Sequence, residues 1–228
     1  MRKWIWSAAL AAVAAVIYGP LVPAARAGDD WEWWIETPVS VKLNSNVKAD
    51  IPGLCRFMND MKDFYYRSFI VGGYYSLASW MEAGGHYWYK ESRKSLQDEW
   101  VDANIAVARL NFKYSPASWL ALKENNRLEF DFSIDRFTLR LKPIAEFPLG
   151  WAGLDPVKLF LDNEFFLTFD FPDDRSTFSE NRATVGAEVQ IAGPAAVILG
   201  YRNVGKKSAA DGSWTFANVL LTSIKLAF

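Results

Sequence analysis

Hydrophobic and polar residues alternate with a period of two along most of the chain. Between Arg182 and Ile191 every second residue is apolar, and the residues between them are polar or Gly. The same alternation covers 127–134, 136–142 and 157–171, where Asn163 is the one interruption of the apolar series. A period of two sustained over many segments indicates β-strands. The pattern therefore predicts an all-β fold.

The alternating segments also suggest how many strands there are. Eleven can be distinguished: 31–43, 46–58, 64–77, 80–90, 100–114, 119–133, 136–147, 157–171, 181–192, 195–204 and 214–228. Single-chain bacterial membrane barrels have even strand numbers, with both chain ends at the periplasmic side. We therefore expect twelve strands, with ten as the alternative. Segment 46–58 is the weakest of the eleven because Pro52-Gly53 interrupts it.

The direction of the apolar face separates two architectures. A secreted soluble barrel or sandwich would turn its apolar face inward, whereas a membrane barrel turns it outward. Hydrophobic residues make up 51% of the chain and aromatics 16%, yet 28–228 contains no apolar run long enough for a spanning helix. This composition, with the density of charge on the polar face, favours an antiparallel transmembrane β-barrel of the outer-membrane type.

Both ends of the sequence point to the same destination. Residues 1–27 have a basic start, an apolar stretch and the small residues Ala25 and Ala27, which predicts a cleaved secretory signal peptide rather than a retained anchor. Residues 28–228 are then a single barrel domain. The last strand is apolar on one face and ends on Phe228, like a strand recognised by the barrel assembly machinery. We expect a bacterial outer-membrane location, with outer-membrane lipid and that machinery as partners.

A series of short motifs resembles one bacterial family. They are Arg56-Phe57 before Asp60, Gly73-Tyr74-Tyr75, Asn126-Arg127-Leu128-Glu129, Asn163-Glu164-Phe165-Phe166, Glu180-Asn181-Arg182, Gly186, Gly200-Tyr201 and Phe228. In this order they resemble the family catalogued as domain of unknown function 2490, a set of predicted outer-membrane barrels. The resemblance covers 28–228 and implies a fold and a location, but no activity and no catalytic residue.

The polar face supplies the candidate ligand-binding residues. By alternation the following should point into the lumen: Arg127, Glu129, Arg136, Arg140, Asp162, Glu164, Arg182 and Glu188. One interpretation is a structural ion-pair lattice that fills a narrow interior. The other is a narrow conduit or binding site for a small solute. The mixed signs weigh against strong ion selectivity.

Enzymatic and metal functions find little support in the sequence. The formal net charge is −1 with no basic patch, so no nucleic acid is expected as a partner. Cys55 is the one cysteine and His86 the one histidine, so we expect no disulfide, no metal site and no cofactor. The enzyme alternative is an outer-membrane lipid hydrolase centred on His86, but the sequence lacks the His-x-Ser-Asn arrangement of outer-membrane phospholipases. We predict no catalytic residues.

Aromatic residues cluster in the first half of the chain: Trp31, Trp33, Trp34, Tyr65, Tyr66, Tyr74, Tyr75, Tyr87, Trp88 and Tyr89. They could form a carbohydrate-binding surface. An aromatic girdle at the membrane interface is the preferred interpretation.

Overall fold

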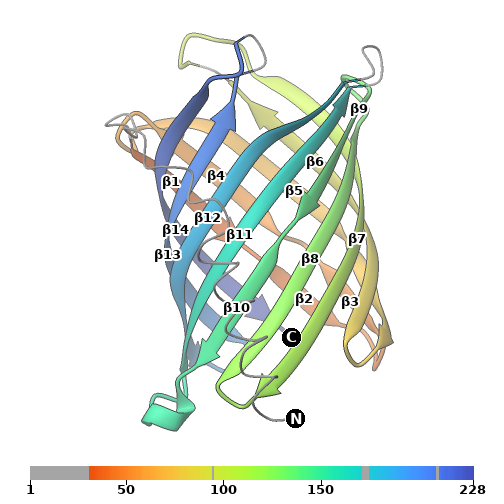
Figure 1. Ribbon diagram of the computed structural model, residues 1–228, viewed down its shortest axis with the longest axis vertical. Coiled ribbons are helices and arrows are strands. Elements are labelled where there is room, and N and C mark those ends of the chain that lie inside the picture. The colour runs from red at the N-terminus through yellow and green to blue at the C-terminus, as the bar shows by residue number, and fades with distance from the viewer. Residues whose placement is uncertain (1–30, 94, 171–174, 209–210) are drawn as a thin grey trace.

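The chain folds into one closed β-barrel in the computed structural model, which describes residues 31–93, 95–170, 175–208 and 211–228 (Figure 1). The predicted signal peptide, 1–27, lies outside the described residues. The strands are β1 (Trp31–Thr37), β2 (Val39–Lys42), β3 (Val47–Asp50), β4 (Gly53–Met58), β5 (Asp63–Ala78), β6 (Met81–Ser92), β7 (Val101–Ala117), β8 (Leu120–Asp131), β9 (Arg136–Leu141), β10 (Pro143–Pro148), β11 (Val157–Asp170), β12 (Arg175–Ala192), β13 (Ala195–Lys207) and β14 (Trp214–Ala227).

The barrel has eleven complete strands, which we call staves. Three staves are each interrupted once and so consist of two shorter strands, which gives fourteen strands in all. The interrupted staves are β1 with β2, β3 with β4, and β9 with β10, and each break lies at or beside a proline. Proline has no N–H to donate across the sheet, so it interrupts the ladder locally. Neighbouring strands still bond at the break, since the Ile51 amide donates to the Val39 carbonyl (2.8 Å). Segment 46–58 is therefore a genuine stave despite Pro52.

The expectation of twelve or ten strands is wrong, and the barrel is mixed rather than wholly antiparallel. Successive staves are antiparallel, so an odd number leaves the first and last running in the same direction. β1 pairs with β14 in parallel register from Trp31 opposite Asn218 to Glu36 opposite Ser223, and β2 continues this pairing. We call this pairing the closing seam. It places Trp31 and Phe228 at opposite ends of the barrel, so the first strand does not begin on the side where the last strand ends, as an even strand number would require.

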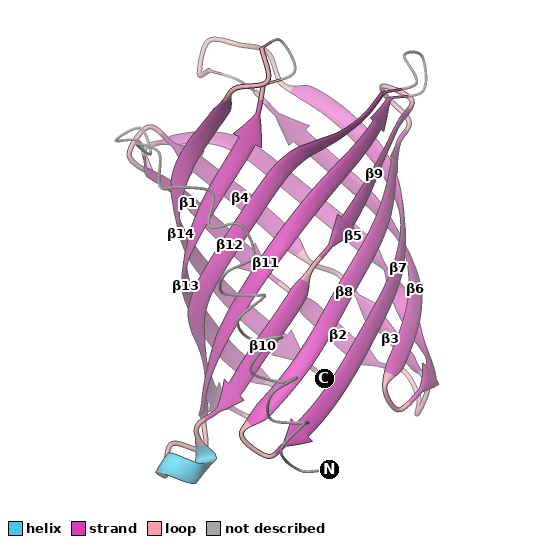
Figure 2. Cartoon of the chain, viewed as in Figure 1, coloured by secondary structure: helices cyan, strands magenta, loops and turns pink. Residues whose placement is uncertain are grey.

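The two ends of the barrel differ in their connections. At the end near Phe228, residues 79–80, 118–119 and 193–194 form two-residue turns, while 149–156 form a longer connection containing the 3₁₀ helix η1 (Gly150–Ala152). At the opposite end the connections are wider, since β6 ends at Ser92 and β7 begins at Val101, and β13 ends at Lys207 and β14 begins at Trp214. We call the two ends the turn end and the loop end (Figure 2). Among the described residues, no helix is long and apolar enough to cross a bilayer.

Large apolar side chains cover the outside of the barrel. On β12, Val185 and Val189 are exposed while Arg182 and Thr184 are buried, which confirms the predicted alternation. Exposed apolar side chains occur on staves all round the barrel, including Phe69, Val71, Tyr75, Tyr87, Leu110, Leu128, Leu159, Leu199, Leu220 and Ile224. Asn163, the one polar residue in the outward series of β11, is buried and accepts a hydrogen bond from the Asn181 amide (2.7 Å).

The interior is not uniformly polar. One buried apolar cluster consists of Tyr66, Ile70, Trp88, Ile105 and Val107, and another of Trp34, Val204, Val219 and Leu221. The girdle interpretation was therefore wrong for Trp34, Tyr66, Tyr74 and Trp88, which are buried inside the barrel, whereas Tyr75 and Tyr87 are exposed. Period-two alternation explains the difference, because neighbouring residues on a strand face opposite sides.

Candidate functional site

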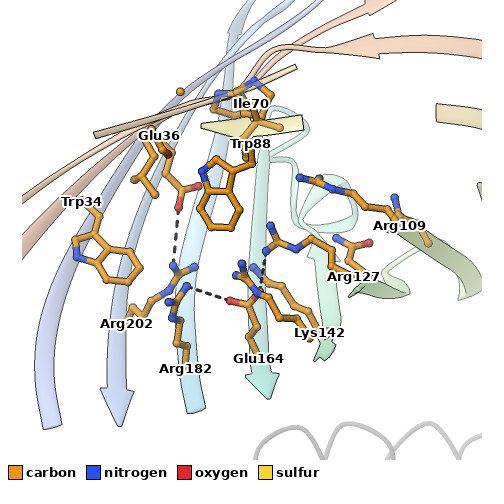
Figure 3. Close-up of a pocket in the computed structure, with 18 of the residues that line it drawn as sticks. Trp34, Glu36, Ile70, Trp88, Arg109, Arg127, Lys142, Glu164, Arg182 and Arg202 are labelled. Carbon is orange, nitrogen blue, oxygen red and sulfur yellow. Dashed lines mark hydrogen bonds and ion pairs between the residues drawn. The ribbon is translucent and has the colours of Figure 1, made fainter. Parts of the chain in front are cut away.

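Glu164 on β11 is the centre of a buried ion-pair cluster within the barrel. Its Oε1 accepts hydrogen bonds from Arg127 Nη2 (2.8 Å) and Arg140 Nη2 (2.6 Å), and its Oε2 lies 3.5 Å from Arg182 Nη1. Arg140 Nη1 also donates to Glu129 Oε1 (2.6 Å). The pairings converge because β11 lies between β9 and β12, with Glu164 directly opposite Arg182 (Figure 3). Five of the predicted site residues thus meet in one cluster.

This cluster forms one wall of the lumen, and both carboxylate oxygens of Glu164 have partners in it. The Glu164 side chain is 2% exposed, so its charge is offset by the surrounding guanidinium groups rather than by bulk water. Arg140 and Arg182 also each lie 4.4 Å from the centre of the Phe166 ring, a cation–π arrangement. Removing one member of such a buried network leaves its partners unpaired, at a cost of about 3–5 kcal/mol.

The other three predicted site residues lie elsewhere in the lumen. Asp162 pairs with Lys142 (3.2 Å) just beyond the cluster, towards the turn end. Glu188 belongs to a second ion-pair group nearer that end, with Lys158 at 3.1 Å and Lys225 at 3.4 Å. Arg136 lies towards the loop end and lines a separate cavity there. All eight predicted residues therefore line the interior, but they do not form one site.

The opposite wall of the lumen is aromatic, and none of its residues was among the predicted ligand-binding residues. The Arg56 guanidinium lies between two rings, 3.7 Å from the centre of Trp34 and 4.2 Å from the centre of Tyr66. Arg202 reaches the same region. Its Nη1 forms an ion pair with Glu36 Oε1 (3.8 Å), and its Nε donates a hydrogen bond to the Thr184 hydroxyl (2.9 Å). Alternation could have placed Trp34 inside, since it shares a strand face with Glu32 and Glu36. Nothing local marks Arg56 as its partner.

Three cavities follow one another along the lumen. A central cavity of about 210 Å³ lies between the two walls (Figure 3). A loop-end vestibule of about 440 Å³ shares Arg56, Trp88, Arg140 and Arg182 with it. A turn-end mouth of about 700 Å³ shares Tyr74, Asn111 and Asn125 with it. Two layers of side chains therefore divide the interior.

Positive charge dominates the central cavity. Its lining includes seven cationic side chains and two carboxylates: Arg56, Arg109, Arg127, Arg140, Lys142, Arg182 and Arg202 against Glu36 and Glu164. The alternating signs read along the strands had weighed against selectivity. In the folded barrel the two signs are distributed unevenly, because several carboxylates, among them Glu146 and Glu188, lie in the turn-end group instead.

His86 has a clear packing role on the inner face of β6. Its ring meets the Tyr74 ring edge-on, with centroids 4.8 Å apart. A Cβ at Gly72 would lie 2.6 Å from the His86 ring, and a Cβ at Gly84 would lie 2.7 Å from the Tyr74 ring. Neither ring nitrogen of His86 has a hydrogen-bond partner among the described residues. The two glycines thus form the floor on which both rings lie.

The described residues contain no group of three or more His, Cys, Asp or Glu side chains placed to hold a metal ion. The central cavity is lined by guanidinium, ammonium, amide and aromatic groups, together with the carboxylates of Glu36 and Glu164. Guanidinium, ammonium and amide groups bind and orient anions and polar solutes by charge and hydrogen bonding.

The fold and the interior together define a closed eleven-stave β-barrel with a charged lumen divided by side chains. The chain belongs to the family described as protein of unknown function (DUF2490), whose model matches residues 31–215. The resemblance noted in the sequence is thereby confirmed. No curated protein matched the sequence.

Proposed function

We propose that the protein is an integral outer-membrane barrel whose lumen is a constricted route for small polar solutes. The membrane part of the proposal is supported by the outside of the barrel. Apolar side chains such as Phe69, Leu128 and Leu199 are about half exposed there, and they occur round the whole circumference. In water so large an apolar surface would promote aggregation, whereas the hydrocarbon of a lipid bilayer solvates it.

Orientation follows from the connections. Outer-membrane barrels have short periplasmic turns and longer extracellular loops. The turn end, with Phe228, accordingly faces the periplasm, and the loop end faces outward. Recognition of the Phe228 strand by the assembly machinery, and removal of 1–27, stay predictions of the same proposal.

The conduit part of the proposal is supported by the succession of cavities along the lumen. Each neighbouring pair shares lining residues, so a solute would meet two side-chain layers and no continuous wide channel. The layer between vestibule and central cavity contains Trp88, whose side chain belongs to the apolar cluster rather than to the ion-pair cluster. The ion pairs around Glu164 hold one wall in place, and the remaining space serves the solute.

Catalysis is not part of this proposal. His86 lies inside the barrel, packed on Gly72 and against Tyr74, which supports a structural role over that of a catalytic base. If the hydrolase alternative were right, purified protein would release fatty acid from phospholipid vesicles and His86→Ala would abolish that release.

Planar-bilayer recording of the refolded chain tests the conduit. We expect small unitary conductances for the native protein and clearly larger ones for Trp88→Ala, because this substitution removes the bulkiest side chain of the shared layer. Trp151→Ala is the matched control, since Trp151 lies in η1 and is 74% exposed. If neither the native protein nor Trp88→Ala conducts above the bare bilayer, the lumen is a structural lattice and the proposal fails.

A further inference from the structure

Arg109 is a lumenal cation that forms no ion pair with a carboxylate of the described part of the chain, although the charge of Asp50 acts on it from further away. Its Nη1 donates to the Tyr74 hydroxyl (2.7 Å), and its buried Nε has no hydrogen-bond partner. No ion pair joins it to any carboxylate among the described residues. Arg56, 8% exposed, also has an unpartnered Nε. Arg109 is half-buried and Arg56 is buried. Charge held away from water without a counterion is costly, so these groups leave the central cavity short of negative charge.

The sheet register places Arg109 in a row of like charges. Arg109 on β7 lies directly opposite Arg127 on β8, which lies opposite Arg140 on β9. Like charges directly opposite each other in a sheet repel. Glu164 offsets this repulsion for Arg127 and Arg140, with which it pairs, but not for Arg109.

The next lumen-facing pair of residues towards the turn end adds further hydrogen-bond donors. Asn111 and Asn125 lie opposite each other on the same two strands, and both line the central cavity beside Arg109 and Arg127. Two guanidinium groups and two amides on adjacent strands thus face one enclosed space. Figure 3 shows Arg109 and Arg127 reaching into it from the same side.

From this arrangement we propose that the central cavity binds one small oxyanion, a carboxylate or phosphate group, between Arg109 and Arg127. Guanidinium forks match the geometry of both groups and bind them in bidentate fashion. The cavity, at about 210 Å³, is smaller than the roughly 300–1,000 Å³ of sites for drug-sized ligands. It therefore suits a free small anion and excludes nucleotides and oligosaccharides. This inference rests on the proposed lumenal function and names its solute class.

The test measures binding of a probe anion to the refolded full chain in detergent micelles. Titration calorimetry at constant ionic strength gives the affinity. Inorganic phosphate and succinate are titrated separately, so that the two arms distinguish a phosphate site from a carboxylate site. We expect saturable binding of at least one probe with one site per chain. Arg109→Gln should weaken it by about tenfold, because one charge-assisted contact is lost, and Arg109→Lys should weaken it less.

Arg67→Gln is the matched control. Arg67 is an exposed arginine of β5 that pairs with Glu91, so the same charge is removed outside the cavity. The affinity of this variant for the probe should equal that of the native chain. A folded barrel migrates on SDS gels at a different position before heating than after it, so comparing heated and unheated samples verifies that each variant has folded. Absence of saturable binding for both probes, or undiminished binding by Arg109→Gln, overturns the inference.

The binding test of the anion site and the conductance test of the conduit can fail independently. Binding without conductance would retain the anion site and reject the conduit. Conductance without binding would reject the anion site alone.

Discussion

Gly72 shows how a single residue shapes the lumen. It lies opposite His86 in the register of β5 and β6, and the absence of a side chain leaves room for the imidazole ring to lie over the backbone. Gly84 does the same for Tyr74 one row further along. Aromatic rings packed over sheet glycines restore contacts that glycine alone would lack. The pair positions Tyr74, which in turn holds Arg109.

Gly72→Ala should destabilise the barrel by about 1–3 kcal/mol, because the new methyl group overlaps the His86 ring and a strand carbonyl. Gly85→Ala, on the other face of β6, is the control, since a Cβ there meets nothing within 4 Å. Urea unfolding of the refolded variants, followed by Trp fluorescence, measures the difference. Equal midpoints for the two variants would remove the packing role assigned to Gly72.

At this scale much of the candidate site could be read from the sequence. Alternation on β8, β11 and β12 correctly placed Arg127, Glu164 and Arg182 inside, because the direction of a strand side chain depends only on its parity. Arg56, which was noted only as part of a family motif, and Arg109 were not predicted as site residues. Their importance comes from what faces them across the barrel, and no local pattern encodes that.

Among the elements, the closing seam is the most informative. The two strands come from opposite ends of the sequence, and their parallel pairing is extended by a hydrogen bond from Trp33 Nε1 to the Thr222 hydroxyl (3.1 Å). Ordinary hairpins cannot produce this arrangement, since a two-residue turn joins only antiparallel strands. The seam is therefore a property of closure and not of any neighbouring pair of segments.

Cysteines placed at Ile35 and Thr222, in a Cys55→Ala background, should form an intramolecular disulfide on mild oxidation. These residues are direct register partners, and facing residues in a sheet lie within disulfide reach. The control pair is Ile35→Cys with Leu226→Cys, because Leu226 faces Val39 instead. Mobility on non-reducing gels and mass spectrometry report the bond. Preferential bonding of the control pair would contradict the register.

The whole molecule has two unlike ends and an odd number of staves. Because the number is odd, the chain enters its first stave at the loop end and leaves its last at the turn end. Local segments were recognised correctly as eleven, and the general rule of even numbers then led to the wrong count. Mitochondrial anion channels, with nineteen strands, show that odd barrels are physically sound.

Membrane insertion and orientation can be tested together on cells that express the chain. In a Cys55→Ala background, Gln97→Cys at the loop end should react with a membrane-impermeant maleimide on intact cells. Ser45→Cys, in the turn between β2 and β3, should react only after the outer membrane is permeabilised. Both residues are exposed, so accessibility alone decides the labelling. The reverse pattern would invert the orientation, and equal labelling in a soluble fraction would reject the membrane barrel.

The sequence by itself determined the strands, their inward and outward faces, the family and most of the ion-pair residues, because a period of two is a local property of extended backbone. The tertiary structure decided the rest. Closure joins residues almost two hundred positions apart, and with it come the parallel seam, the odd count and the opposition of an ionic and an aromatic wall. The surplus of positive charge in the central cavity also exists only after closure, since it depends on which side chains from different strands share one enclosed space.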